Sequence, residues 1–93
     1  MHAKIVFVNT TSRLVAARLS EDKYVVFEYF CADVFQVGEL LICERLKFGS
    51  SMCERKEAKV RTEINILSPS MSFVKAKLVV APWQNASVED LAV

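Results

Sequence analysis

The chain has 93 residues, of which 53% are hydrophobic and 25% charged, and its formal net charge is +1. This length predicts one domain, and the apolar content excludes a disordered chain because burial of that surface offsets the entropy lost on folding. No apolar run approaches the roughly 20 residues of a membrane-spanning helix, and the first residues do not have the pattern of a secretory signal, so we expect a cytoplasmic protein with no membrane contact.

The first thirty residues predict a meander of β-strands. Residues 3–8 (AKIVFV) alternate and are rich in β-branched and aromatic side chains, which is typical of a strand. Residues 14–19 (LVAARL) predict a second strand or the continuation of a bent first one. A four-residue turn at 20–23 leads into residues 24–30 (YVVFEYF), the stretch with the strongest preference for a strand.

The middle of the chain is less regular. Residues 31–37 predict a loop or a single helical turn, and residues 40–46 (LLICERL) predict a strand that is apolar on both faces where it begins. Residues 47–56 contain Gly49 and two serines, and we expect them to form the longest loop.

Residues 59–67 alternate cleanly and predict a further strand, with Ile64 and its apolar neighbours on one face and Lys59 and Arg61 on the other. A turn is expected at 68–70. Residues 72–81 are compatible with a helix, but their β-branched content and the following Pro82 favour a strand.

Five or six short strands separated by turn signals predict an all-β domain. A two-sheet sandwich is hard to fill at this length, whereas a small barrel removes exposed strand edges by closing on itself. We therefore expect an antiparallel meander forming a five- to six-stranded barrel over residues 1–82. Residues 83–93 are expected to form a short C-terminal tail with one helical turn, anchored to the barrel by Trp83 or presenting it to a partner.

The strand layout resembles the OB-fold, the small barrel of cold-shock proteins and related RNA-binding domains. A long bent first strand, an aromatic-rich strand at 24–30 and then Val37-Gly38-Glu39-Leu40 opening the next strand are similar to that group. The resemblance covers about residues 3–67 and implies a barrel whose face binds single-stranded nucleic acid. The glycine and aromatic motifs of cold-shock domains are absent here. The opening of the chain also resembles that of short, uncharacterised bacterial proteins.

Two groups of side chains are candidates for nucleic-acid binding. Tyr24 and Phe30 share a strand face with Glu28, which predicts that both aromatic rings point outward, where bases stack on OB-type strands. The alternative is that these rings lie under the tail, a helical cap or a second subunit.

The second group is basic. Residues 47–81 contain seven basic and three acidic side chains, enough for a small phosphate-contacting groove but not for a duplex-DNA binder. The exposed faces of two predicted strands carry the remaining basic residues of interest, Lys59, Arg61, Lys75 and Lys77. These residues form one groove only if the two strands are neighbours. A solvated edge that lysines protect from aggregation is the alternative.

Catalysis and metal binding find little support in the sequence. The only histidine is His2, expected in a mobile terminus, no glycine-rich phosphate loop is present, and the serines have no histidine partner. The three cysteines, Cys31, Cys43 and Cys53, lack metal-ligand spacing and suit a reducing compartment, with Cys43 a core residue rather than a reactive thiol. We expect no enzyme, no cofactor and no metal.

Several strands are apolar on both faces, which predicts a second buried surface outside the barrel and favours a homo-oligomer or a stable protein partner. The leading hypothesis is therefore a non-enzymatic barrel that binds single-stranded RNA or DNA. The alternative is a protein-interaction or assembly module, oligomeric through its apolar strand faces, with no role in nucleic-acid binding.

Overall fold

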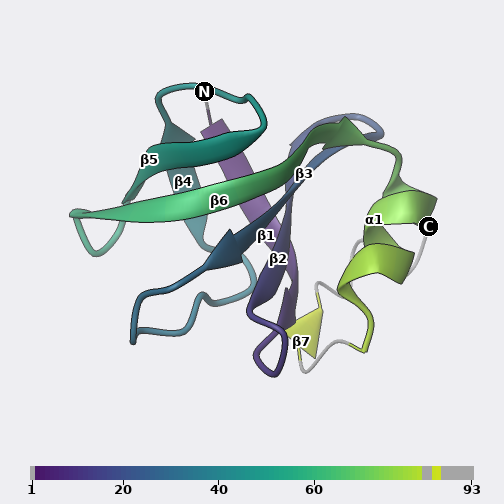
Figure 1. The fold of residues 1–93 in the computed structure, drawn as a ribbon, viewed down its shortest axis with the longest axis horizontal. Helices are drawn as coiled ribbons and strands as arrows, with labels where there is room; N and C mark the ends of the chain where they lie inside the picture. The colour runs from purple at the N-terminus through teal and green to yellow at the C-terminus, as the bar shows by residue number, and fades with distance from the viewer. Residues whose placement is uncertain (1, 83–84, 87–93) are drawn as a thin grey trace.

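Seven strands and one helix are present in this computed structural model, which describes residues 2–82 and 85–86 (Figure 1). In chain order they are β1 (His2–Asn9), β2 (Leu14–Ser20), β3 (Lys23–Tyr29), β4 (Leu40–Cys43), β5 (Gly49–Arg55), β6 (Val60–Met71), α1 (Phe73–Val80) and β7 (Asn85–Ala86).

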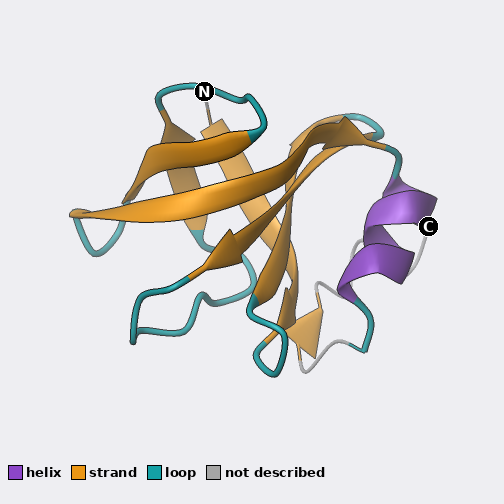
Figure 2. Ribbon diagram, viewed as in Figure 1, coloured by secondary structure: helices purple, strands orange, loops and turns teal. Residues whose placement is uncertain are grey.

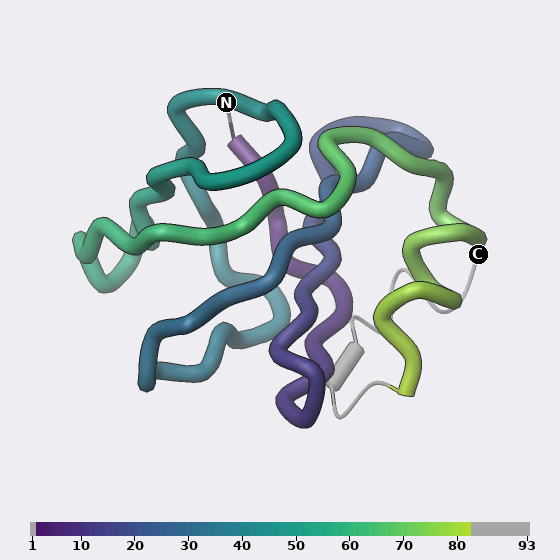
Figure 3. Tube along the Cα trace, viewed as in Figure 1, coloured from purple at the N-terminus to yellow at the C-terminus, as the bar shows by residue number. Residues whose placement is uncertain are grey.

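Six of the strands close into an antiparallel barrel made of two three-stranded meanders. Strands β1, β2 and β3 follow one another, as do β4, β5 and β6. The second meander joins the first where β6 pairs with β3 and where β4 pairs with β1, and the tube in Figure 3 follows this path. The order around the barrel is β1-β2-β3-β6-β5-β4, and β7 adds to β1. The prediction of a small all-β barrel is confirmed, and this closed barrel is compatible with an OB-like fold.

The barrel interior is filled by the inward side chains of alternating strand residues. In β3 these are Val25, Phe27 and Tyr29, and in β6 they are Ile64 and Ile66, as the alternation in the sequence predicts. Cys43 also lies in this core, as expected.

Residues 30–39 connect the two meanders without a helical turn, so the loop alternative is correct. Phe35 from this loop enters the end of the barrel core. Its ring stands edge-on to Phe27 and Tyr29, with ring centroids 5.5 and 5.2 Å apart. The loop therefore contributes an aromatic side chain to the core in addition to connecting the two meanders.

A second apolar cluster lies outside the barrel, between the strands and α1. Figure 2 shows this helix beside the barrel strands. Ala76 and Val80 of the helix pack on a patch formed by buried outward side chains of β1, β2 and β3, which are Val6, Phe7, Ala16, Tyr24 and Val26. The predicted second buried surface is confirmed. The chain's own helix covers it, so this surface no longer requires a second subunit, and the oligomer remains a prediction.

The prediction of a strand at 72–81 is wrong. Ser72 is the N-cap of α1, and its hydroxyl accepts a hydrogen bond from Lys75 N at 3.3 Å. Asp22 Oδ1, from the turn between β2 and β3, accepts one from Phe73 N at 2.9 Å. These two acceptors satisfy amide groups that a helix start leaves unpaired. Together with the apolar patch beneath, they outweigh the strand preference of the valines.

Two other expectations about the second half are also wrong. The segment expected as the longest loop, 47–56, contains β5, which pairs with β4 on one side and β6 on the other. The expected turn at 68–70 lies within β6. The register of β3 with β6 shifts on both sides of Val26, and Pro69 falls in this irregular stretch, where a missing backbone N–H is tolerated.

Further predictions concerned the two ends of the chain. His2, expected in a mobile terminus, pairs with Ile42 as part of β1. Trp83 and the helical turn predicted at 88–91 lie outside the described residues. No helix among residues 2–82 reaches the length and apolar character needed to cross a membrane.

Candidate functional site

The two aromatic residues predicted to stack bases lie in different surroundings. Tyr24 is only 4% exposed because α1 covers it, and its ring centroid is 5.6 Å from that of Phe73. Tyr24 therefore points out of the barrel, as predicted, but α1 covers it, so the helical-cap alternative is correct for this residue and its ring is not available to stack on a base. Phe30, directly after the other end of β3, is 59% exposed and remains available to a ligand.

The basic residues expected on two neighbouring strands are divided between the two ends of the barrel. Lys59 is exposed in the turn between β5 and β6, and Arg61 follows at the start of β6. Lys75 and Lys77 belong to α1, at the opposite end of the long axis (Figure 1). Lys77 Nζ lies 5.9 Å from the ring centroid of Phe73, a cation–π distance. A single groove lined by all four cations is not formed.

Arg61 lies on a sheet face where acidic side chains predominate. Its guanidinium pairs with the carboxylate of Glu44. Glu54 faces Arg61 directly across β5 and β6, and Glu63 lies two residues further along β6 on the same face. Such a face repels a phosphate backbone.

The outward side of α1 carries an apolar stripe formed by Val74 and Leu78, and Val79 is exposed on the far side of Lys75. Val74 is 65% exposed and Leu78, one turn later, is 71% exposed. Lys75 lies on one side of the stripe and Lys77 on the other, as the helical spacing requires, and the helix contains no acidic residue. The helix is thus apolar both towards the barrel and towards the surface.

Two polar contacts fix this helix on the barrel. Asp22, from the turn between β2 and β3, caps its first turn, as described above, and Asn9 holds its last turn. The Asn9 side chain is buried, and its Nδ2 donates to the carbonyl oxygen of Val80 at 2.9 Å. The Oδ1 of the same amide accepts from the backbone N–H groups of Thr11 and Ser12. The α1 stripe is therefore presented in a defined orientation.

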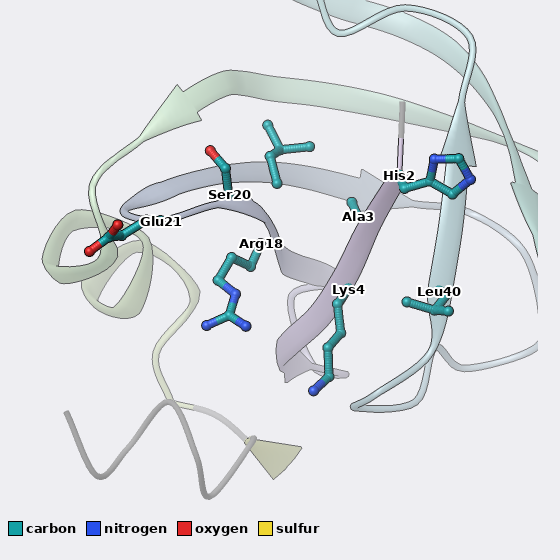
Figure 4. A pocket seen from close by; sticks show the side chains of 8 residues that line it. His2, Ala3, Lys4, Arg18, Ser20, Glu21 and Leu40 are labelled. Atoms are coloured by element: carbon teal, nitrogen blue, oxygen red, sulfur yellow. The ribbon is translucent and has the colours of Figure 1, made fainter.

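A hollow of about 490 Å³ lies between β1, β2 and the start of β4 (Figure 4). Lys4 and Arg18 face each other directly across β1 and β2, and both side chains extend to the same side. The hollow is lined by His2, Ala3, Lys4, Arg18, Leu19, Ser20, Glu21 and Leu40. Sequence analysis missed this basic juxtaposition, although the short β1–β2 turn was a signal that these two strands are neighbours.

A buried ion pair holds the 30–39 loop. Arg55 Nε donates to Glu39 Oε1 at 2.5 Å, and Nη2 donates to Glu39 Oε2 at 3.0 Å. The same guanidinium donates to the carbonyl oxygens of Asp33 and Val34, both at 3.1 Å, and lies 4.3 Å from the Phe35 ring centroid. Hydrogen bonding to Glu39 raises the pKa of Arg55 further above its ordinary value.

Arg55 lies in the segment 47–56 that was expected to be a loop, and the structure instead places it at the end of β5 and buries it. Gln36 N also donates to Glu39 Oε2, at 3.0 Å. Every strong donor and acceptor of the pair is thus satisfied within the chain, as burial of charge requires.

The described part of the chain contains no group of three or more His, Cys, Asp or Glu side chains that could hold a metal ion. Comparison of the sequence with protein-family models and with curated proteins, and of the fold with solved structures, gave no match.

Proposed function

We propose that this chain is a protein-interaction module that binds its partner through the α1 stripe. The observation that carries the proposal is the exposure of Leu78 and Val74 on a helix whose opposite side is already buried. Apolar side chains one turn apart on a rigid helix match the anchor positions by which helices recognise apolar surfaces, and the polar contacts of Asn9, Ser72 and Asp22 reduce the entropy lost on binding.

The basic charge beside the stripe indicates which kind of partner fits it. Lys75 is exposed at the edge of the stripe, and the helix itself carries no acidic side chain. A second copy docked on this stripe by two-fold symmetry would bring lysines towards lysines, which costs free energy. The occupant that fits is an apolar segment of a different protein with acidic residues at its edges.

A defined peptide tests this proposal. The probe is a fluorescein-labelled amphipathic helical peptide with leucines on one face and glutamates on both flanks, and its control has lysines in place of the glutamates. Fluorescence anisotropy should show tighter binding of the glutamate peptide, weakening as salt is raised. Leu78→Glu should weaken its binding at least about tenfold, since a buried anchor contributes more than 1.4 kcal/mol.

Phe48→Glu is the matched control variant, because Phe48 is also 71% exposed but belongs to the β4–β5 connection. It should leave peptide binding unchanged, and circular dichroism should show that both variants keep the fold. Equal binding by Leu78→Glu and the unchanged protein would refute the proposal, as would a preference for the lysine peptide. A dimer that Leu78→Glu dissociates, seen by light scattering, would identify a second copy as the occupant and overturn our assignment.

Single-stranded nucleic-acid binding is the second candidate, in line with the finer resemblance to cold-shock and RNA-binding OB domains. The observation that favours it is the exposed ring of Phe30, directly after β3. The test is anisotropy of labelled single-stranded RNA and DNA at two salt concentrations, comparing Phe30→Ala and Lys59→Ala/Arg61→Ala with the unchanged protein. An absence of binding at tens of micromolar would remove this candidate.

We also propose that the protein works in a reducing, cytoplasmic compartment, which the odd number of cysteines favours.

A further inference from the structure

Two cysteines face each other inside the barrel. Cys43 of β4 is directly opposite Cys53 of β5, and both are buried. The hydrogen bonds on either side define their position in the ladder: Glu44 N donates to Met52 O at 3.3 Å, and Lys56 N donates to Leu40 O at 3.0 Å. Since bonded and non-bonded pairs alternate in an antiparallel ladder, Cys43 and Cys53 form a non-hydrogen-bonded pair.

This position suits a cross-link. In a non-hydrogen-bonded pair the Cα atoms are about 4.5 Å apart and the side chains approach closely, within the range of about 4.4–6.8 Å that a disulfide requires. The two thiols lie in the same part of the barrel core and each shifts the pKa of the other. Formation of the bond therefore needs rotation of two side chains and little movement of the strands.

This mutual influence makes the two sulfurs chemically unequal. Hydrogen bonding with Cys53 lowers the pKa of the Cys43 thiol, although burial acts in the opposite direction. Hydrogen bonding with Cys43, together with burial, raises the pKa of Cys53. Cys43 is accordingly the sulfur that forms a thiolate first, and the thiolate is the nucleophile in thiol chemistry.

A hollow of about 220 Å³ lies near the pair and is lined by Glu44, Arg45, Lys47, Ser50, Ser51 and Met52, and neither cysteine is among its lining residues. Cys31, by contrast, belongs to the 30–39 loop, where its thiol donates a hydrogen bond to the carbonyl oxygen of Asp33 at 3.3 Å.

We propose that Cys43 and Cys53 form a reversible dithiol–disulfide site that is oxidised by a small hydroperoxide. The Cys43 thiolate attacks one oxygen of hydrogen peroxide, which gives the sulfenic acid of Cys43 and releases hydroxide. The Cys53 sulfur then attacks the Cys43 sulfur, a disulfide forms, and water leaves. In total, two thiols and one peroxide give one disulfide and two waters. A small dithiol reverses the change by exchange.

The expected consequence is a covalent link between β4 and β5. It closes a loop of 11 residues, from Cys43 to Cys53, and a loop of this size restricts the unfolded chain enough to raise Tm by about 10–20 °C. This property is independent of the proposed partner binding, because α1 does not contact β4 or β5 through its buried cluster.

Mass spectrometry of folded Cys31→Ser protein tests the proposal, since only the two facing thiols remain. After treatment with hydrogen peroxide, the intact mass should fall by two hydrogens, a peptide joining residues 43 and 53 should appear, and Tm should rise. Dithiothreitol should reverse all three changes. The matched control is Cys31→Ser/Cys53→Ser, which should show no loss of hydrogen and no rise in Tm.

Three results would overturn the proposal. The first is gain of oxygen without cross-linking in Cys31→Ser, and the second is cross-linking only between chains. The third is a disulfide that forms in denaturant but not in the folded protein. Circular dichroism before treatment establishes that each variant is folded, so a missing disulfide counts against the site itself.

Discussion

Replacement of Arg55 by alanine removes the group that fastens the 30–39 loop to the barrel. The guanidinium donates two hydrogen bonds to Glu39 and one each to the carbonyl oxygens of Asp33 and Val34. In Arg55→Ala the Glu39 carboxylate stays buried and keeps only the hydrogen bond from Gln36 N. The variant therefore loses a buried charge pair and leaves one charge without compensation.

The expected cost is about 4 kcal/mol in the free energy of unfolding, because removal of one partner of a buried ion pair costs about 3–5 kcal/mol. A domain of this length has a total stability of about 5–14 kcal/mol, so the effect is a large fraction of the whole. The contact of Arg55 with the Phe35 ring acts in the same direction. Arg55→Lys should recover little, since one ammonium cannot reproduce the planar fork of donors.

Urea unfolding followed by far-ultraviolet circular dichroism measures this cost. Arg61→Ala is the control, because Arg61 also pairs with a glutamate but both side chains are exposed, and it should cost at most about 1 kcal/mol. Glu39→Gln/Arg55→Met should be more stable than Arg55→Ala, because it removes both charges together. A cost for Arg55→Ala no larger than that for Arg61→Ala would refute the assignment of the buried pair as the fastening of the loop.

Three further predictions concern the helix, a loop and pH. Asn9→Ala should cost about 1–3 kcal/mol in a urea melt, because the Val80 carbonyl loses its buried donor; an unchanged midpoint would contradict this. Gly38→Ala should destabilise the chain by about 1 kcal/mol although a methyl group has space there, since φ is +91°, and equal stability would show that the strain argument fails. Burial raises the pKa of Tyr29 above its ordinary 10.0, while Arg13 acts in the opposite direction. Above pH 10 the phenol loses its proton in the unfolded chain but keeps it in the folded one. The free energy of unfolding should therefore not depend on Tyr29 below pH 10 and should fall as pH rises above 10. Tyr29→Phe should flatten that part of the pH profile.

The fold could be predicted in the strands where apolar and polar residues alternate in step with burial. Alternation correctly placed β1, β2 and β3 and put Ile64 and Ile66 inside the barrel. The helix could not be predicted in this way, since residues 73–80 contain three valines and a strand preference. Asp22, which caps that helix, lies 51 residues away from Phe73, and no local pattern reveals such a partner.

The candidate site was also difficult to predict, because exposure depends on which elements cover a strand face. Periodicity correctly placed Tyr24 and Glu28 on one strand face, but that face is covered at one end and open at the other, so the two side chains differ in exposure. Exposure of Leu78 depends on which side of α1 meets the barrel, which is a tertiary property. The strand face shared with Glu28 also predicted that Phe30 points outward, and its ring is exposed.

The division of the barrel into two meanders has a consequence for synthesis and folding. Until β6 pairs with β3 and β4 with β1, the first meander is an open sheet with two unpaired edges. Such edges readily pair with other chains, and contacts between distant segments form slowly because the intervening chain must first be closed. Arg55, which secures the connecting loop, belongs to the second meander. The period of greatest aggregation risk therefore ends only when about the first 71 residues have been made, at the end of β6.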